Sequence, residues 1–161
     1  MRILGVLCGV AAAFTLSVTL ASPAVAAGSS KIPTAPVSVR GGECGSSYAL
    51  VGVHPVNNQH TDETELHMEI YWSSSAKRNC LISRHQGDAY GQARDTLAMI
   101  RPTGSAWPAC PSSVGCDRGN YAYYAGPVYT PAGVDMSNRC IDFGGTAGIQ
   151  VDKILYKQHC D

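Results

Sequence analysis

Six cysteines between residues 44 and 160 are the sequence feature that most constrains how this chain folds. An even number of cysteines in an exported chain indicates disulfides, whereas a structural zinc site would show close CxxC pairs, which are absent here. The sequence therefore predicts three disulfides and no metal site. The cysteines are Cys44, Cys80, Cys110, Cys116, Cys140 and Cys160.

The pairing of these cysteines is only partly fixed by their spacing. Cys110 and Cys116 are separated by a turn-rich Pro-Ser-Ser-Val-Gly stretch, so this short ring is the first predicted bond. Because chain ends often lie close together, a bond between the outermost two cysteines is plausible. Two arrangements are thus favoured for the other four, the second nearly as strongly: Cys44–Cys160 with Cys80–Cys140, or Cys44–Cys80 with Cys140–Cys160.

The N-terminus predicts a secretory signal peptide over residues 1–26. Arg2 is the only charge before Lys31, and residues 3–20 are almost entirely apolar or small. Pro23 then breaks the apolar run, and a small-x-small site (AVA) precedes Ala27, as in a cleavable signal. We expect cleavage near Ala26 and no membrane attachment afterwards.

Two alternatives for this segment are a membrane anchor and a lipid-modified cysteine. The apolar run is near the lower length limit for crossing a bilayer, and the small residues after Pro23 favour cleavage. At Cys8, Leu7 stands where a lipid-attachment motif needs a small residue. Both alternatives are therefore disfavoured.

The remainder of the chain predicts one domain without an electrostatic partner. Residues 27–43 are rich in Ser, Pro and Gly and predict a flexible lead segment, and residues 44–161 suffice for a single core. Twelve Lys and Arg residues balance twelve Asp and Glu residues. A balanced chain has no long-range field for nucleic acid or anionic lipid, so neither is an expected partner.

The clearest secondary-structure signal is a period-two alternation over residues 65–72, which is typical of a half-buried strand. We expect one face, Leu66, Met68, Ile70 and Trp72, to be in the core. We expect the other, Glu65, His67 and Glu69, to be solvated. Same-face side chains on one strand lie about 6.5–7 Å apart, too far to share one metal ion without a neighbouring strand.

The other segments read as short strands separated by turns. Segment 95–101 has a helical turn as its alternative, as has 154–160, and Pro127 marks a bulge or sheet edge within 121–129. Loops are expected at 86–92 and 102–119. This pattern predicts an all-β, disulfide-stapled sandwich or barrel of about six to eight strands. The further strands are expected at 48–56, 79–85, 139–143 and 148–151.

No motif supports catalysis. A G-x-S-x-G elbow is absent and the histidines are scattered, so we expect no enzyme and no cofactor. Exposed aromatic rings stack on sugars or pack against partners, although ordinary core and strand composition is the favoured explanation of these aromatic residues. The candidate contact residues are Trp107, Tyr121, Tyr123, Tyr124 and Tyr129. The ring between Cys110 and Cys116 suggests, as an alternative, a pre-organised protease-inhibitor loop.

Five stretches in order along the chain carry a resemblance to a known family: 44–48 (CGSSY), 71–80 (YWSSSAKRNC), 120–129 (NYAYYAGPVY), 140–145 (CIDFGG) and 159–160 (HC). Together they resemble the spore-associated protein A family of small secreted proteins from filamentous soil bacteria. The resemblance implies an extracellular or spore-surface protein without established enzymatic activity, and it supplies no catalytic residues. The family pattern lacks the pair Cys110 and Cys116, so residues 102–118 are an elaboration in this chain.

These observations predict a secreted, non-enzymatic protein that acts by binding or structural association at a cell or spore surface. The expected partners are cell wall, spore surface or another extracellular protein. The loop 102–118 and the Tyr-rich segment 121–129 are the first candidates for contact. The identity of the ligand and the oligomeric state stay open.

Overall fold

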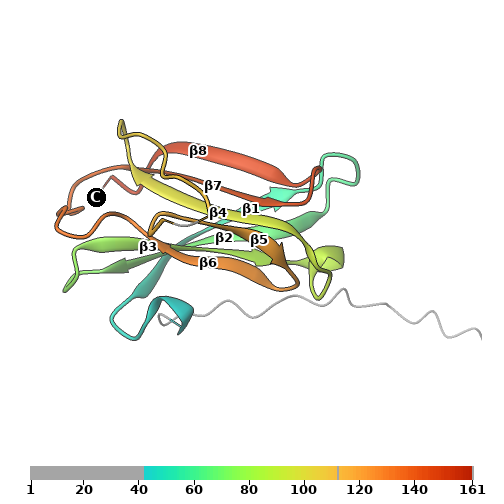
Figure 1. Ribbon diagram of the computed structural model, residues 1–161, viewed down its shortest axis with the longest axis horizontal. Coiled ribbons are helices and arrows are strands. Elements are labelled where there is room, and N and C mark those ends of the chain that lie inside the picture. Colours follow the sequence, from blue (N-terminus) through green and yellow to red (C-terminus); the bar gives the residue numbers. More distant parts are fainter. Residues whose placement is uncertain (1–41, 112, 161) are drawn as a thin grey trace, which may run out of the picture. The chain divides into compact units, whose positions relative to one another are not determined.

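The computed structural model, which describes residues 42–111 and 113–160, has two four-stranded antiparallel sheets (Figure 1). The first sheet has the order β1-β2-β3-β6 and the second the order β5-β4-β7-β8. The predicted all-β class is confirmed, with a sandwich as its form. The strands are β1 (Ala49–Asn57), β2 (Thr64–Ser73), β3 (Arg78–His85), β4 (Arg94–Pro102), β5 (Cys116–Tyr121), β6 (Tyr124–Tyr129), β7 (Ile141–Ala147) and β8 (Asp152–Gln158).

Helical structure in this part of the chain is limited to two single turns. These are the 3-10 turns η1 (Gly42–Cys44) and η2 (Gly87–Ala89). Within the described residues no helix is long and apolar enough to span a bilayer. The predicted signal peptide, and the predicted lead segment up to residue 41, lie outside the described residues.

The main core lies between the two sheets and uses the predicted face of β2. Leu66, Met68 and Ile70 are fully buried, whereas Trp72 at the end of the strand packs against the core only partly. The second sheet contributes Ile100 from β4 and Phe143 from β7. Strict alternation along β2 thus placed its apolar residues correctly.

The expectation that the other face of β2 is solvated was wrong. Glu65 and Glu69 are buried: Glu65 is paired with Arg94 and Asn58, whereas Glu69 lies on the side of the first sheet where the chain around η1 forms a second apolar cluster. Burial of Glu69 is compensated by Arg84, whose Nε donates to its carboxylate at 2.9 Å, and by the Tyr71 hydroxyl at 2.8 Å. The members of the second cluster are Cys44, Tyr48, Tyr71, Cys80 and Ile82, flanked by Leu50, Tyr124 and Tyr129.

The disulfides follow the second of the two arrangements left open by the sequence. The bonds are Cys44–Cys80, Cys110–Cys116 and Cys140–Cys160. The slightly preferred pairing of Cys44 with Cys160 and Cys80 with Cys140 was wrong. Cys140 and Cys160 instead flank the open end of the β7–β8 hairpin, where Ile141 faces Gln158. Three such bonds indicate an oxidising compartment.

Two predicted boundaries around residues 102–129 also change. Strand β5 begins at Cys116 inside the expected loop, and segment 121–129 contains the end of β5, a turn that leads from the second sheet to the first, and β6. Strand β6 does form a sheet edge, and its pairing with β3 shifts register opposite Gly126 and Pro127. The expected edge or bulge at Pro127 is therefore confirmed.

Strand β7 is longer than the strand expected at 139–143, because it continues through Gly144 and Gly145 to Ala147, and residues 148–151 form no strand. A Cβ atom at Gly145 would come within 2.6 Å of the Ser83 Oγ and 3.1 Å of Leu66 Cδ2 in the facing sheet. Glycine is therefore needed here for close approach of the sheets and does not mark a turn. The turn falls later, at Gly148, where φ is +82°.

Candidate functional site

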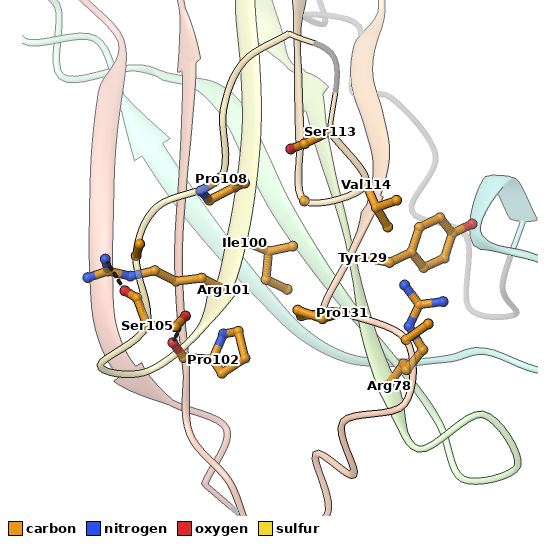
Figure 2. Close-up of a pocket in the computed structure, with 13 residues that line it drawn as sticks. Arg78, Ile100, Arg101, Pro102, Ser105, Pro108, Ser113, Val114, Tyr129 and Pro131 are labelled. Atoms are coloured by element: carbon orange, nitrogen blue, oxygen red, sulfur yellow. Dashed lines mark hydrogen bonds between the residues drawn. The ribbon is translucent and has the colours of Figure 1, made fainter.

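An apolar pocket of about 400 Å³ opens where the loop after β4 meets the end of β6 (Figure 2). Its size lies in the range of small-molecule sites in proteins. Among the described residues that line it, none carries a carboxylate or an imidazole. The lining residues are Arg78, Ile100, Arg101, Pro102, Ser105, Ala106, Pro108, Ser113, Val114, Gly115, Tyr129, Pro131 and Ala132.

Backbone hydrogen bonds and a disulfide hold the loop against the strands. The Ile100 N–H donates to the Gly115 carbonyl at 2.9 Å, and the Tyr129 N–H donates to the Val114 carbonyl at 2.8 Å. The bond between Cys110 and Cys116 closes the loop beside β5. Proline residues fix φ and carry no N–H donor, so the three in the lining make the wall stiff and apolar.

Arg101 contributes its alkyl stem to the pocket, but its charge is already neutralised. Its Nε donates to the Asp142 carboxylate at 3.0 Å, and its guanidinium stacks on Trp107 at 4.0 Å from the ring centroid. Burial alone would raise the pKa of Asp142. Hydrogen bonds from Thr103, the Lys157 N–H and Arg101 outweigh it and hold that pKa below its ordinary value. Asp142 is therefore ionised and paired.

Arg78 is differently placed, at the side of the pocket away from Arg101 (Figure 2). Its Nε donates to the Thr130 carbonyl at 2.7 Å, and its guanidinium lies 5.1 Å from the centroid of the Tyr129 ring. Its Nη2 is buried, and within the described residues it has no hydrogen-bond acceptor. A half-buried guanidinium without a carboxylate partner is unusual in the wall of an apolar pocket.

Tyr129 links the pocket to the second apolar cluster. Burial raises the pKa of its phenol, so the hydroxyl is neutral and donates to the Cys44 carbonyl at 3.2 Å. The ring also packs against Tyr48, with 5.6 Å between the ring centroids. The position of Tyr129 is therefore fixed by the hydrogen bond of its hydroxyl to Cys44 and by the contact of its ring with Tyr48.

The structure separates the five aromatic residues that the sequence singled out. Only Tyr129 lines the apolar pocket. Trp107 is half-buried, contacts Arg101 and Tyr156, and is not among the lining residues. The other three, Tyr121, Tyr123 and Tyr124, line a shallower hollow of about 360 Å³ with Asp117, where Tyr123 is 52% exposed.

The loop 102–118 was predicted from the sequence as a contact site, whereas Arg78 was not. Arg78 reaches Thr130, 52 positions further along the chain, because β3 pairs with β6. No local motif marks such a residue, since its role depends on which strands are neighbours. The cysteine pair at 110 and 116 was the signal that drew attention to the loop.

The histidines do not form a metal site with the acidic residues. Among the described residues there is no group of three or more His, Cys, Asp or Glu side chains arranged to hold an ion. The Glu65 carboxylate contacts Arg94 and accepts from Asn58, so it belongs to an ion pair. His54 of β1 and His159, the residue after β8, approach within 3.0 Å through their Nε2 atoms.

His85 is fully buried, and burial favours its neutral ring. Its Nδ1 lies 3.0 Å from the Ala89 carbonyl and 3.2 Å from the Ala122 carbonyl, so this nitrogen carries the proton. Its Nε2 lies 2.8 Å from the Thr96 Oγ1, and the Thr96 hydroxyl donates to the Arg94 carbonyl at 2.9 Å. Burial lowers the pKa of His85 below its ordinary value, and burial likewise lowers those of His54 and His67.

We expect the domain to lose stability as the pH falls from 7.5 to 5.5. Because the folded pKa of His85 lies below 6.5, the unfolded state binds more protons below that pH, and the free energy of unfolding decreases with it. The contribution of one such buried group is at most about 1.4 kcal/mol per pH unit. Urea unfolding at pH 7.5, 6.5 and 5.5 measures the slope. A constant or rising free energy of unfolding would contradict the neutral assignment of His85.

In comparisons with known proteins, no family model, no curated protein and no solved structure matches this chain.

Proposed function

We propose that this chain is a secreted, non-enzymatic binding protein that associates with a cell or spore surface through the apolar pocket beside Tyr129. The pocket is the observation that carries the proposal. It combines the predicted contact loop with one of the predicted aromatic residues, and it lies on a stiff, disulfide-closed frame. Such pre-organisation reduces the entropy lost on binding.

The chemistry of the wall supports binding over catalysis. Its described polar side chains are two arginines, one tyrosine and two serines, without a base within the lining set to activate a hydroxyl. An extracellular location is supported by the three disulfides and by the signal-like N-terminus. Surface association is supported by the resemblance to spore-associated proteins.

Val114 offers the sharpest test of this proposal, because it lines the pocket and yet is 62% exposed. The substitution Val114→Asp places a charge in the apolar wall without emptying the core. We expect it to reduce retention of the oxidised mature protein on cell walls, spores or insoluble polysaccharide at least tenfold. Co-sedimentation of purified protein with each of these fractions measures the effect.

Val53→Asp is the matched control, since Val53 is a 37% exposed valine of β1 that does not line the pocket. It should leave retention unchanged. Equal losses in the two variants, or no retention of the wild-type protein on any fraction, would contradict the proposal.

The protease-inhibitor alternative can be distinguished from surface binding with the same purified protein. The ring is folded into a turn, in which the Cys116 N–H donates to the Ser113 carbonyl at 3.1 Å, and it is bonded to β6 through Val114. An inhibitor loop is extended and projects from its frame. Stoichiometric inhibition in a panel of subtilisin-like and trypsin-like proteases, without surface retention, would establish the alternative in its place.

A further inference from the structure

Two polar groups of the pocket lining lack a hydrogen-bond partner among the described residues, the Arg78 Nη2 and the Ser113 Oγ, and only the first belongs to a charged side chain. Three other arginines with comparably covered side chains, Arg84, Arg94 and Arg101, each contact a carboxylate. Arg78 contacts none in the part of the chain that the structure describes, although it is half-buried and its Nη2 is fully covered. Removing a cation from water is costly unless an anion compensates it.

The contacts that Arg78 does make are weaker than an ion pair. One carbonyl accepts from Nε, and the face of the Tyr129 ring attracts the cation at 5.1 Å. A cation–π contact is worth about 0.5–1 kcal/mol at exposed sites and more when desolvated. These contacts orient the guanidinium and leave its Nη1 and Nη2 groups without a hydrogen-bond acceptor among the described residues.

We propose that the pocket takes an apolar molecule that carries one carboxylate, which accepts hydrogen bonds from Arg78 while the hydrocarbon part lies against Ile100, Val114 and the prolines. This inference rests on the proposed function, whose site it specifies. A guanidinium presents its donors in a planar fork that matches a carboxylate.

The pocket fits a single negative charge better than a phosphate. The second arginine of its lining, Arg101, is already bonded to Asp142, so one cation remains for a ligand. The Ile100 N–H and the Tyr129 N–H are already paired with the carbonyls of Gly115 and Val114, so these two donors are not free for a larger anion. One guanidinium without a carboxylate partner, set in an apolar wall, therefore favours a hydrocarbon ligand that carries a single carboxylate.

The test compares straight-chain carboxylates from propionate to octanoate with the primary alcohols of the same length, by calorimetry on the oxidised mature protein at pH 7. Burial of each methylene should tighten binding roughly fourfold in both series. Each carboxylate should bind at least tenfold more tightly than its alcohol. N-acetyl-leucine and its amide form a third pair, which distinguishes a peptide terminus from a free acid as the source of the carboxylate.

Arg78→Gln should abolish the preference for carboxylate and keep the dependence on chain length. Arg118→Gln, which changes an exposed arginine outside the pocket, should leave both unchanged. Equal binding of acids and alcohols by the wild-type protein would overturn this inference and leave the pocket as a binding site. Binding of no probe at all would overturn the assignment of the pocket to small apolar ligands as well.

Discussion

Reduction of the three disulfides is expected to unfold the described domain at 25 °C. The bridges close segments with sequence separations of 36, 20 and 6 residues. The chain-entropy model assigns such loops about 4, 3 and 2 kcal/mol in that order. The sum is comparable with the whole stability of a typical domain, about 5–15 kcal/mol. Circular dichroism before and after reduction measures the loss of strand structure.

Removal of single bridges should follow the same order. The pair Cys44→Ser and Cys80→Ser should cost most, because this bridge also holds η1 over the second apolar cluster. The pair Cys110→Ser and Cys116→Ser should cost least and serves as the control for cysteine substitution itself. Titratable thiols among the six cysteines of the denatured, unreduced protein, or a reduced domain that keeps its spectrum, would contradict this account.

Glu69→Gln is expected to destabilise the domain by about 3–5 kcal/mol, because it removes one partner of a buried ion pair. Glu69 is fully buried, and the Arg84 side chain is 9% exposed. The Arg84 charge would then keep only Glu43, which is more exposed and lies 3.0 Å away. Urea unfolding at pH 7 measures the change.

The matched control for this prediction is Asp95→Asn. Asp95 pairs with Arg118, and both side chains are more than half exposed. Surface pairs of this kind contribute about 0–1 kcal/mol. A cost for Glu69→Gln as small as that of the control would show that the outer side of β2 is open to water, as the sequence alone suggested.

The sequence was informative wherever a pattern was local. Alternation over residues 65–72 predicted which residues of β2 are in the core, and Pro127 predicted a sheet edge. It failed for Glu65 and Glu69, because polar residues in alternation look the same whether water or another segment covers them. Here the chain around Cys44, joined to Cys80, packs on the side of Glu69, and Arg94 of the second sheet pairs with Glu65.

The candidate site likewise combines features that a local pattern predicted with features that depend on long-range contacts. The loop was predicted from its cysteines, and Tyr129 from its aromatic segment. The pocket also needs β3 beside β6, and it needs Arg101 to be neutralised by Asp142 of β7. Contacts between residues dozens of positions apart leave no local mark in one sequence, so Arg78 was not identifiable from it.

Chemical-shift mapping of the backbone amides of the oxidised mature protein tests most directly whether ligands bind in the apolar pocket. Hexanoate and hexanol serve as probes. We expect the largest changes with either probe at the amides of residues 100–101, 113–115, 129, 130 and 132, and we expect these changes to be lost in Val114→Asp. Changes concentrated on residues 121–124, around the shallower hollow, or the absence of any saturable change would contradict it.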